Sequence, residues 1–358
     1  MTDGLSQRAL NRATLARQYL LERASVRAVD AIERLAGMQS QAPLAPYVGL
    51  WTRLPDFAPG ELATLTQERR VVRLQLMRNT VHLVSARDAL AWAALFAPLP
   101  AAEFNANFRA GTAGADLSAV LGEARRLLAE RPRTRAELGR LLAERWPQAE
   151  PRALGYAVTL HLTLCQVPPR GVWGKGGAAT WAPLADWLGA PLDSVPVDAL
   201  VLRYLGAFGP ASVADVQAWS GLTRLREVVV RLPVRSFRGE AGQTLYDLPD
   251  APRPASDTPA PPRFLPEYDN LLLSHSDRTR VIPHQRPVPL PPGNGATGGT
   301  FLIDGRWQGS WRLRDQKLRI RPFVELRPAD RDALLAEAAG LCAFIAPGTT
   351  ADVILDHP

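Results

Sequence analysis

The sequence predicts an α+β protein made of tandem winged-helix (helix-turn-helix) units followed by a β-rich C-terminal portion. Three observations support this class. An order of three helical patterns followed by a hairpin pattern occurs three times before residue 250. A proline-rich segment then interrupts the chain, and an alternating strand meander with one closing helix follows it. This repeated order of elements indicates tandem units, although the residues themselves show no strong repeat.

The chain is long enough for several domains and carries a strong basic charge. It has 358 residues, a net charge of +7 and a pI of about 10. Of its 42 basic residues only Lys175 and Lys317 are lysine, a bias that a GC-rich genome would also produce. A basic surface favours a polyanionic partner, because phosphate binding releases condensed counterions. DNA is therefore the expected partner, and codon usage is the alternative explanation of the arginine content.

The apolar and cysteine patterns favour a cytoplasmic protein. No apolar run is long enough to span a membrane, and the first residues have no signal-peptide core. Cys165 and Cys342 lie far apart in predicted helices, which fits neither a disulfide framework nor a metal site. The five histidines show no ligand spacing, so no metal or other cofactor is expected. No exposed heptad is visible, and the expectation is a monomer in the cytoplasm, associated with the nucleoid.

Residues 1–112 are predicted to form the first winged helix. Helical spacing marks residues 8–23, and Ser25 is a good N-cap for a second helix. Pro43 is the expected first turn of a third helix. Alternating patterns then predict the two strands of a wing, at 71–76 and 80–85.

Residues 113–190 and 191–250 repeat this order. In the first of these segments Thr134 begins a capping box, and a helix from Arg152 to Cys165 is predicted as the recognition helix. Two short strands around the glycines of residues 172–181 form its wing. In the second segment, capping residues open the middle helix and a glycine-containing hairpin closes the unit. Winged helices are a DNA-binding form, although some of them bind proteins instead.

The last part of the chain is predicted to hold a linker and a compact β-rich portion. Residues 251–263 form a linker by composition, stiffened by proline. Residues 264–358 then contain a three-stranded meander with tight turns and a final amphipathic helix at about 329–346.

Two glutamines, Gln39 and Gln41, stand where a helical pattern is weakened by Gly37 and ends before Pro43. In a continuous helix these two positions diverge by about 200°, so both face one cleft only if the helix is interrupted. A neutral amide is a poor general base, but it can hold a water by donating and accepting hydrogen bonds. By spacing alone, two ordinary glutamines at a helix end are the simpler interpretation.

At this point the residues resemble the AlkZ/YcaQ group of winged-helix DNA glycosylases. The matching motifs occur in the same order as in that group and are spread over nearly the whole chain. They are Met38–Pro43, Tyr47–Trp51, Arg78–Leu83, Leu265–Asn270, Ile303–Gly305 and Gly309–Arg312.

The resemblance implies three tandem winged helices and a β-rich portion arranged as a C-shape around a basic channel. It implies removal of bulky N7-alkylpurines from double-stranded DNA, including the unhooking of interstrand crosslinks, and an AlkZ branch that is associated with self-resistance to alkylating natural products. Gln39 and Gln41 match the catalytic Gln-x-Gln of the AlkZ branch, whereas the YcaQ branch has Gln-x-Asp. The histidine motif of the family falls on His82. An open cleft is expected, because a crosslinked base cannot be flipped fully out.

The expected chemistry requires little acid catalysis. An N7-alkylguanine is cationic, so its glycosidic bond is weakened and the base leaves as a neutral species. Gln39 is expected to position the attacking water, Gln41 to support it or to contact the sugar, and His82 to hydrogen-bond a phosphate or the water. The candidates for DNA contacts are Arg78, Asn79, Ser85, Arg152, Tyr156, Lys175, His275, Arg278, Arg306 and Arg312.

Three other interpretations stay open on the sequence alone. Glu267 and Asp269 could act as an acid–base pair, although acidic residues beside a linker are usually solvated. The chain could be a transcriptional regulator that binds a palindrome as a dimer. It could also be a non-catalytic resistance protein that binds damaged DNA or the genotoxin itself.

Overall fold

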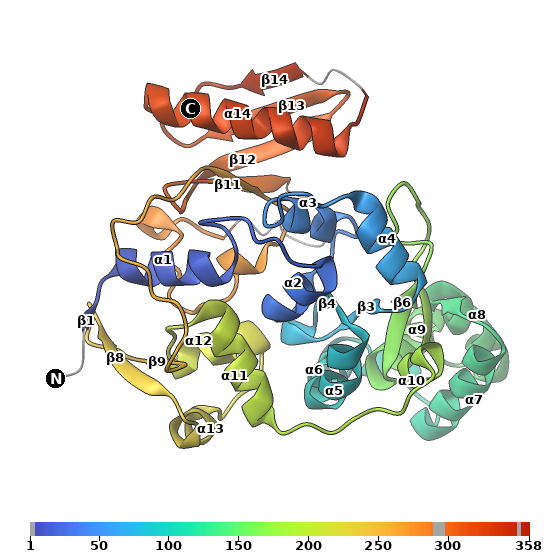
Figure 1. Ribbon diagram of the computed structural model, residues 1–358. Helices are drawn as coiled ribbons and strands as arrows, with labels where there is room; N and C mark the ends of the chain where they lie inside the picture. Colours follow the sequence, from blue (N-terminus) through green and yellow to red (C-terminus); the bar gives the residue numbers. More distant parts are fainter. Residues whose placement is uncertain (1–3, 289–297, 349–351) are drawn as a thin grey trace. The chain divides into compact units, whose positions relative to one another are not determined.

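The computed structural model describes residues 4–288, 298–348 and 352–358 and confirms the α+β class (Figure 1). The chain forms two compact units. The first consists of Met1–Glu61, Asp198–Trp219 and Thr223–Pro358, and the second of Leu62–Val197 and Ser220–Leu222. The winged-helix boundaries at 112, 190 and 250 stay a prediction. Among the described residues, no helix is both long and apolar enough to cross a membrane.

The first unit contains two sheets and most of the short helices. Its helices are α1 (Gln7–Arg17), α2 (Ala28–Arg34), α3 (Ala45–Trp51), α11 (Val197–Phe208), α12 (Val213–Ser220), α13 (Arg226–Arg231) and α14 (Pro328–Ile345), and α4 (Pro59–Gln67) leads into the second unit. The smaller sheet has the order β1-β8-β9, with β1 (Gly4–Leu5) parallel to β8 (Arg235–Gly239) and β9 (Thr244–Asp247) antiparallel to it.

The larger sheet of the first unit contains the predicted meander. Its order is β10-β11-β12-β13-β14, with strands at Arg263–Leu265, Gly299–Ile303, Arg306–Arg314, Lys317–Pro322 and Asp352–Leu355. The predicted final helix is α14, which packs on this sheet around Trp311, Leu318 and Ile320. The neighbouring part of the sheet, around Leu302 and Trp307, packs on α1 through Leu15.

The predicted proline-rich linker is bound along α1 by a row of arginines. Arg8 Nε donates to the Ser256 carbonyl at 2.7 Å, and Arg12 Nε donates to the Thr258 carbonyl at 2.6 Å. Arg17 reaches the Pro252 carbonyl one turn further on, at 3.1 Å. Prolines cannot donate backbone hydrogen bonds, so such a segment offers carbonyls for the guanidinium groups to bind. Part of the arginine excess therefore stabilises the fold.

The second unit joins two wings in one sheet. Its strands β3 (Val71–Gln75), β4 (Val81–Ser85), β5 (Arg133–Thr134), β6 (Leu164–Val167) and β7 (Thr180–Pro183) have the order β4-β3-β6-β7-β5. Its helices are α5 (Ala86–Phe96), α6 (Pro98–Asn107), α7 (Leu117–Glu130), α8 (Arg135–Arg145), α9 (Pro151–His161) and α10 (Leu184–Leu188). The Thr134 hydroxyl accepts from the Glu137 amide at 3.1 Å, which confirms the predicted cap of α8.

The predicted end of the helix at Cys165 is wrong. The helix ends at His161, and Cys165 lies in β6, where it pairs with Ala182 of β7. The wing strands are therefore β6 and β7, which flank the glycine-rich segment 172–181 instead of lying mostly inside it. Residues 160–164 alternate apolar and polar side chains as a strand does, but Leu162 also continues the helical spacing of Leu154 and Val158, so periodicity could not locate the break. Burial raises the pKa of the Cys165 thiol to about 12, which makes it unreactive.

Candidate active site

The Gln39–Gln41 motif lies at an interruption between two short helices. Helix α2 ends at Arg34, and Ala36 and Gly37 then adopt positive φ angles of 53° and 86°. This left-handed turn suits glycine and directs the chain into the short strand β2 (Met38–Gln39). The motif is therefore not helical, and the helical divergence between positions i and i+2 does not apply to it. The predicted interruption at Gly37 is confirmed.

A small cavity borders Gln39 within the first unit. It has about 10 Å³ of room, close to the minimum for one water and far too little for a purine. Gln39 is 7% exposed, and Gln41 is half-buried. The other polar residues that line the cavity are Gln18, Arg53, Asp269 and Asn270.

A buried ion pair supports this cavity. Arg53 Nη2 donates to Asp269 Oδ1 at 3.0 Å, and both side chains are almost fully buried. Arg53 also donates to the Gly49 carbonyl at 2.9 Å and, more weakly, to Gln18 Oε1 at 3.4 Å. Asp269 Oδ1 also accepts from the Leu271 amide at 2.9 Å, so this carboxylate oxygen accepts two hydrogen bonds. The pair fixes α3 against the segment that contains the Leu265–Asn270 motif.

The Leu265–Asn270 motif reaches the Gln-x-Gln turn directly. Asn270 Nδ2 donates to the Gly37 carbonyl at 3.4 Å, across 233 positions of the sequence. Glu267 points elsewhere, since its Oε1 accepts from the Gly298 amide at 3.2 Å. The roles of Arg53 at the cavity and of Asn270 at the turn could not be predicted from the sequence, because pairings between distant residues are not visible in local spacing. The ion pair gives the Asp269 carboxylate a structural role.

His82 lies on the β3–β4 hairpin of the second unit, where it pairs with Leu74 across the strands. Its side chain is buried, and Nδ1 lies 3.0 Å from the Thr80 carbonyl. A carbonyl can only accept, so Nδ1 carries the proton in this contact. The turn of the same hairpin places Arg78 and Asn79 at φ 55°, and Asn79 Nδ2 donates to Glu103. Gln39 and His82 thus belong to different units, and their convergence on one cleft stays a prediction.

Three of the predicted DNA contacts have structural roles in the fold. Ser85 is buried and caps α5 by accepting from the Asp88 amide at 3.2 Å. His275 is 1% exposed, with Nδ1 3.0 Å from the Ser274 hydroxyl and Nε2 3.1 Å from the Phe208 carbonyl. Arg278 donates from Nε to the His275 carbonyl. Burial argues against a phosphate contact for Ser85 and His275 and indicates a structural role for both side chains.

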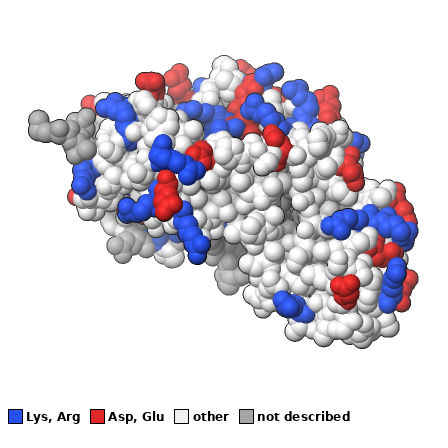
Figure 2. All heavy atoms as spheres, turned by 90° about the horizontal axis from the view of Figure 1, so that it is seen from below, with Lys and Arg blue, Asp and Glu red and all other residues white. Residues whose placement is uncertain are grey.

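The other predicted DNA contacts are more accessible. Arg152, Lys175 and Arg312 are exposed, and Arg306 is half-buried on β12. Tyr156 on α9 stacks on Phe108, with ring centroids 3.8 Å apart, so one face of its ring is already covered. The charge is not uniform over the surface: one face in Figure 2 shows lysine and arginine side chains interspersed with acidic ones. Contacts by these residues with DNA stay predictions.

The buried His275 should make stability depend on pH. Burial and the nearby Arg280 cation lower its pKa to about 3 from the ordinary 6.5, although Asp215 acts in the opposite direction. The unfolded chain therefore binds a proton that the native protein does not, between pH 6.5 and pH 3. We expect the free energy of unfolding to fall as the pH drops below 6.5, with a share of about 2 kcal/mol from this group at pH 5.

Urea unfolding at pH 7 and pH 5 measures this share. His275→Gln should be less stable at pH 7 and should show a flatter profile between the two values. His284→Gln, at an exposed position, is the control and should keep the wild-type profile. Parallel profiles for the wild type and His275→Gln would contradict the assignment.

No group of three or more histidine, cysteine, aspartate or glutamate side chains in the described part of the chain is placed to hold a metal ion. The other polar side chains that line the cavity are the amides of Gln18 and Asn270 and the Arg53–Asp269 ion pair, a set suited to holding a water or a neutral polar group. Hydrolysis at this site would therefore depend on positioning and on a substrate that is already activated.

Comparisons with known proteins agree with one another. The model of a protein family described as DNA glycosylase AlkZ-like matches residues 32–344. A protein from Streptomyces sahachiroi, named an interstrand DNA cross-link repair glycosylase, is 26% identical over 352 residues, covering 90% of this chain and 92% of the relative. The solved structure of the Streptomyces sahachiroi DNA glycosylase AlkZ matches with a TM-score of 0.80 at 20% identity, covering 99% of this chain and 100% of that one.

Proposed function

The chain belongs to the AlkZ-like DNA glycosylase family, and we propose that it hydrolyses the N-glycosidic bond of bulky N7-alkylpurines in duplex DNA. The observation that carries the proposal is the Gln39–Gln41 turn. Two uncharged amides lie on non-helical backbone, and one of them, Gln39, borders a cavity that a buried ion pair also lines and that has room for about one water. Such a site can orient a nucleophile but cannot ionise to activate it.

In the proposed reaction, Gln39 holds the attacking water and Gln41 supports it or contacts the sugar. The water oxygen bonds to the anomeric carbon as the bond from that carbon to the base nitrogen breaks. The bonding electrons pass to the base and neutralise its positive charge, and a water proton is released to solvent. His82 hydrogen-bonds a phosphate or the water. Because the leaving base is neutral, no general acid is needed.

Two features support a monofunctional enzyme that acts on crosslinks as well as on single adducts. A strand-cleaving glycosylase uses an amine nucleophile, whereas neither lysine of the chain, Lys175 or Lys317, lines the cavity beside Gln39. That cavity is also too small to enclose a flipped purine. A base tied to the opposite strand does not need to enter a pocket here, and the relative from Streptomyces sahachiroi is named for crosslink repair. We propose a cytoplasmic monomer acting on nucleoid DNA.

A base-release assay tests the proposal. The protein is incubated with a duplex containing one N7-methylguanine and, separately, with a duplex joined by a nitrogen-mustard crosslink. We expect free base and an alkali-labile abasic site from the first, and separated strands that carry an abasic site from the second. No strand break should appear before alkali treatment. Sequence-specific binding without any base release would instead support the transcriptional regulator, and binding to damaged DNA without release would support the resistance protein.

A further inference from the structure

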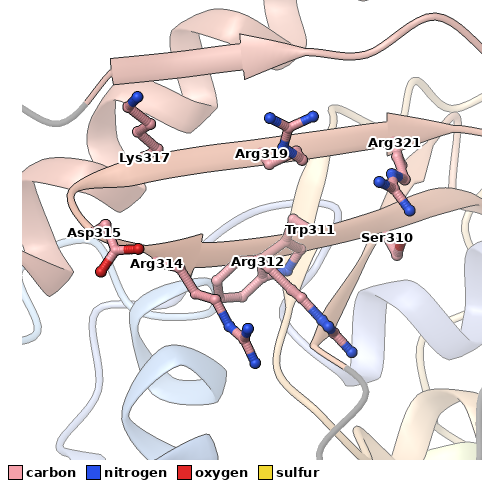
Figure 3. A pocket seen from close by; sticks show the side chains of 8 residues that line it. All are labelled: Ser310, Trp311, Arg312, Arg314, Asp315, Lys317, Arg319 and Arg321. Carbon is pink, nitrogen blue, oxygen red and sulfur yellow. The ribbon is translucent and has the colours of Figure 1, made fainter.

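The hairpin of β12 and β13 has two chemically different faces. Trp311, Leu318 and Ile320 point into the core beneath α14. Side chains at the alternate positions point to the opposite side and line a hollow of about 510 Å³. Five of these are cations, and we call them the cationic sheet face: Arg312, Arg314, Lys317, Arg319 and Arg321 (Figure 3).

The strand register places these cations opposite one another. Arg312 faces Arg319, and Arg314 faces Lys317 across the two strands. Like charges directly opposite each other in a sheet destabilise the pair. Three carboxylates lie beside these cations: Asp356 binds both Arg319 and Arg321, at 2.8 and 3.0 Å, Asp315 lies in the turn, and Asp352 of β14 pairs with Lys317 across the strands. The face still gathers more cations than carboxylates, and an anionic partner would relieve the repulsion between the facing cations.

The geometry suits a chain of phosphates. Alternate residues of an antiparallel strand are about 6.8 Å apart, so each strand presents a regular row of cations. Four of the five are arginines, whose planar forks bind phosphate oxygens with two hydrogen bonds. Among the described residues that line the hollow, Trp311 is the one aromatic side chain. It is 8% exposed and donates its Nε1 to the Leu265 carbonyl, so it offers no platform for stacking bases. Contact with the backbone of a duplex fits these features better than single-strand binding.

We infer that the cationic sheet face binds the phosphate backbone of duplex DNA and adds sequence-independent affinity to the protein. The inference rests on the proposed action on DNA, but it concerns binding and not base release. It extends the predicted contact at Arg312 to four further residues. It also gives a function to the face of the sheet that points away from α14, because the face toward α14 forms the hydrophobic core.

The test uses the full-length protein and a short undamaged duplex whose affinity is measured by fluorescence anisotropy between about 50 and 200 mM salt. The variant is Arg314→Gln with Lys317→Gln, which removes two exposed charges. Each lost phosphate contact should reduce the slope of log K against log salt by about 0.9, so the double variant should lose nearly 2 and bind about 10-fold more weakly or worse at the lower salt.

Arg327→Gln with Arg331→Gln is the matched control. It removes the same charge from exposed positions at the start of α14, on the other side of the same sheet, and should leave the slope nearly unchanged. An equal loss in both double variants, or an unchanged slope in the first, overturns the inference. Base release from N7-methylguanine DNA is measured in parallel at saturating protein. If the wild type releases no base but the Arg314→Gln/Lys317→Gln variant has a reduced slope, only the proposed excision is rejected. If the wild type releases base but the slope of this variant is unchanged, only the phosphate contact is rejected.

Discussion

Replacing Gln39 by alanine should reduce the single-turnover rate of N7-methylguanine release by about 100-fold or more, the range seen when one positioned hydrogen-bonding group is removed from a hydrolytic site. The amide would both accept from and donate to the attacking water, and alanine can do neither. Affinity for undamaged duplex should stay close to that of the wild type, because Gln39 is 7% exposed and carries no charge. The rate is measured by quantifying released base at saturating protein.

A matched control separates chemistry from packing. Gln18→Ala also removes an amide from the wall of the cavity, where Gln18 Nε2 donates to the Ala207 carbonyl at 2.8 Å. It should lower the midpoint of thermal unfolding and leave the rate at low temperature within a few-fold of the wild type. Equal rate losses in the two variants would show a general disturbance of the cavity and would reject a specific role for Gln39.

Position 41 offers a second comparison. The YcaQ branch of the group that the sequence resembles has aspartate there, whereas this chain matches the AlkZ branch. Gln41→Asp should therefore keep measurable release, and Gln41→Ala should lose most of it. Neither glutamine of the wild-type motif ionises, so the contribution of the motif to the rate should not vary with pH. Aspartate introduces a group with an ordinary pKa of about 3.9, so the Gln41→Asp rate should fall at acidic pH.

Part of the local structure could be predicted from spacing and caps, although the predicted cap at Ser25 is wrong, because α2 begins at Ala28 and its N-cap is Arg27. The predicted cap at Thr134 is confirmed at the start of α8. The first wing is confirmed as β3 and β4 with a turn at Met77–Asn79. These features depend on neighbours a few residues apart, where propensity and periodicity act directly.

Other features could not be predicted because they depend on contacts between distant residues. Strand β14 was not anticipated, since it is defined by its parallel pairing with β13. The support of the Gln39 turn by Asn270 joins segments more than 200 residues apart. The family motif pointed to the stretch Leu265–Asn270 without saying what it does. The structure shows that Asn270 of this stretch donates to the Gly37 carbonyl of the turn, and that Asp269 binds Arg53, which lines the cavity beside Gln39.

Removing the carboxylate of Asp269 should be among the most destabilising single changes in the protein. Asp269→Ala leaves the Arg53 guanidinium buried without its counter-charge, and breaking a pair of this kind costs about 3–5 kcal/mol of unfolding free energy. Denaturant unfolding measures the loss. Because Asp269 Oδ1 also accepts from the Leu271 amide, the start of the helical turn Asn270–Leu272 should loosen, and with it the contact of Asn270 to Gly37.

A double-mutant cycle with Arg53→Met tests whether the cost arises from the unpaired charge. Methionine fills much of the space of the arginine stem without its charge, so the combined variant should be more stable than the sum of the two single losses predicts. Strict additivity would contradict the ion-pair explanation.

The same position separates a structural carboxylate from a catalytic one. Asp269→Asn keeps the shape and one acceptor oxygen, so it should lose stability while the folded fraction still releases base at a rate within a few-fold of the wild type. A variant with wild-type stability and no base release would instead make Asp269 a catalytic acid or base. That outcome would remove the reason to assign the chemistry to glutamines, because an ionisable group adjoining the same cavity would then supply the proton transfer that Gln39 and Gln41 cannot.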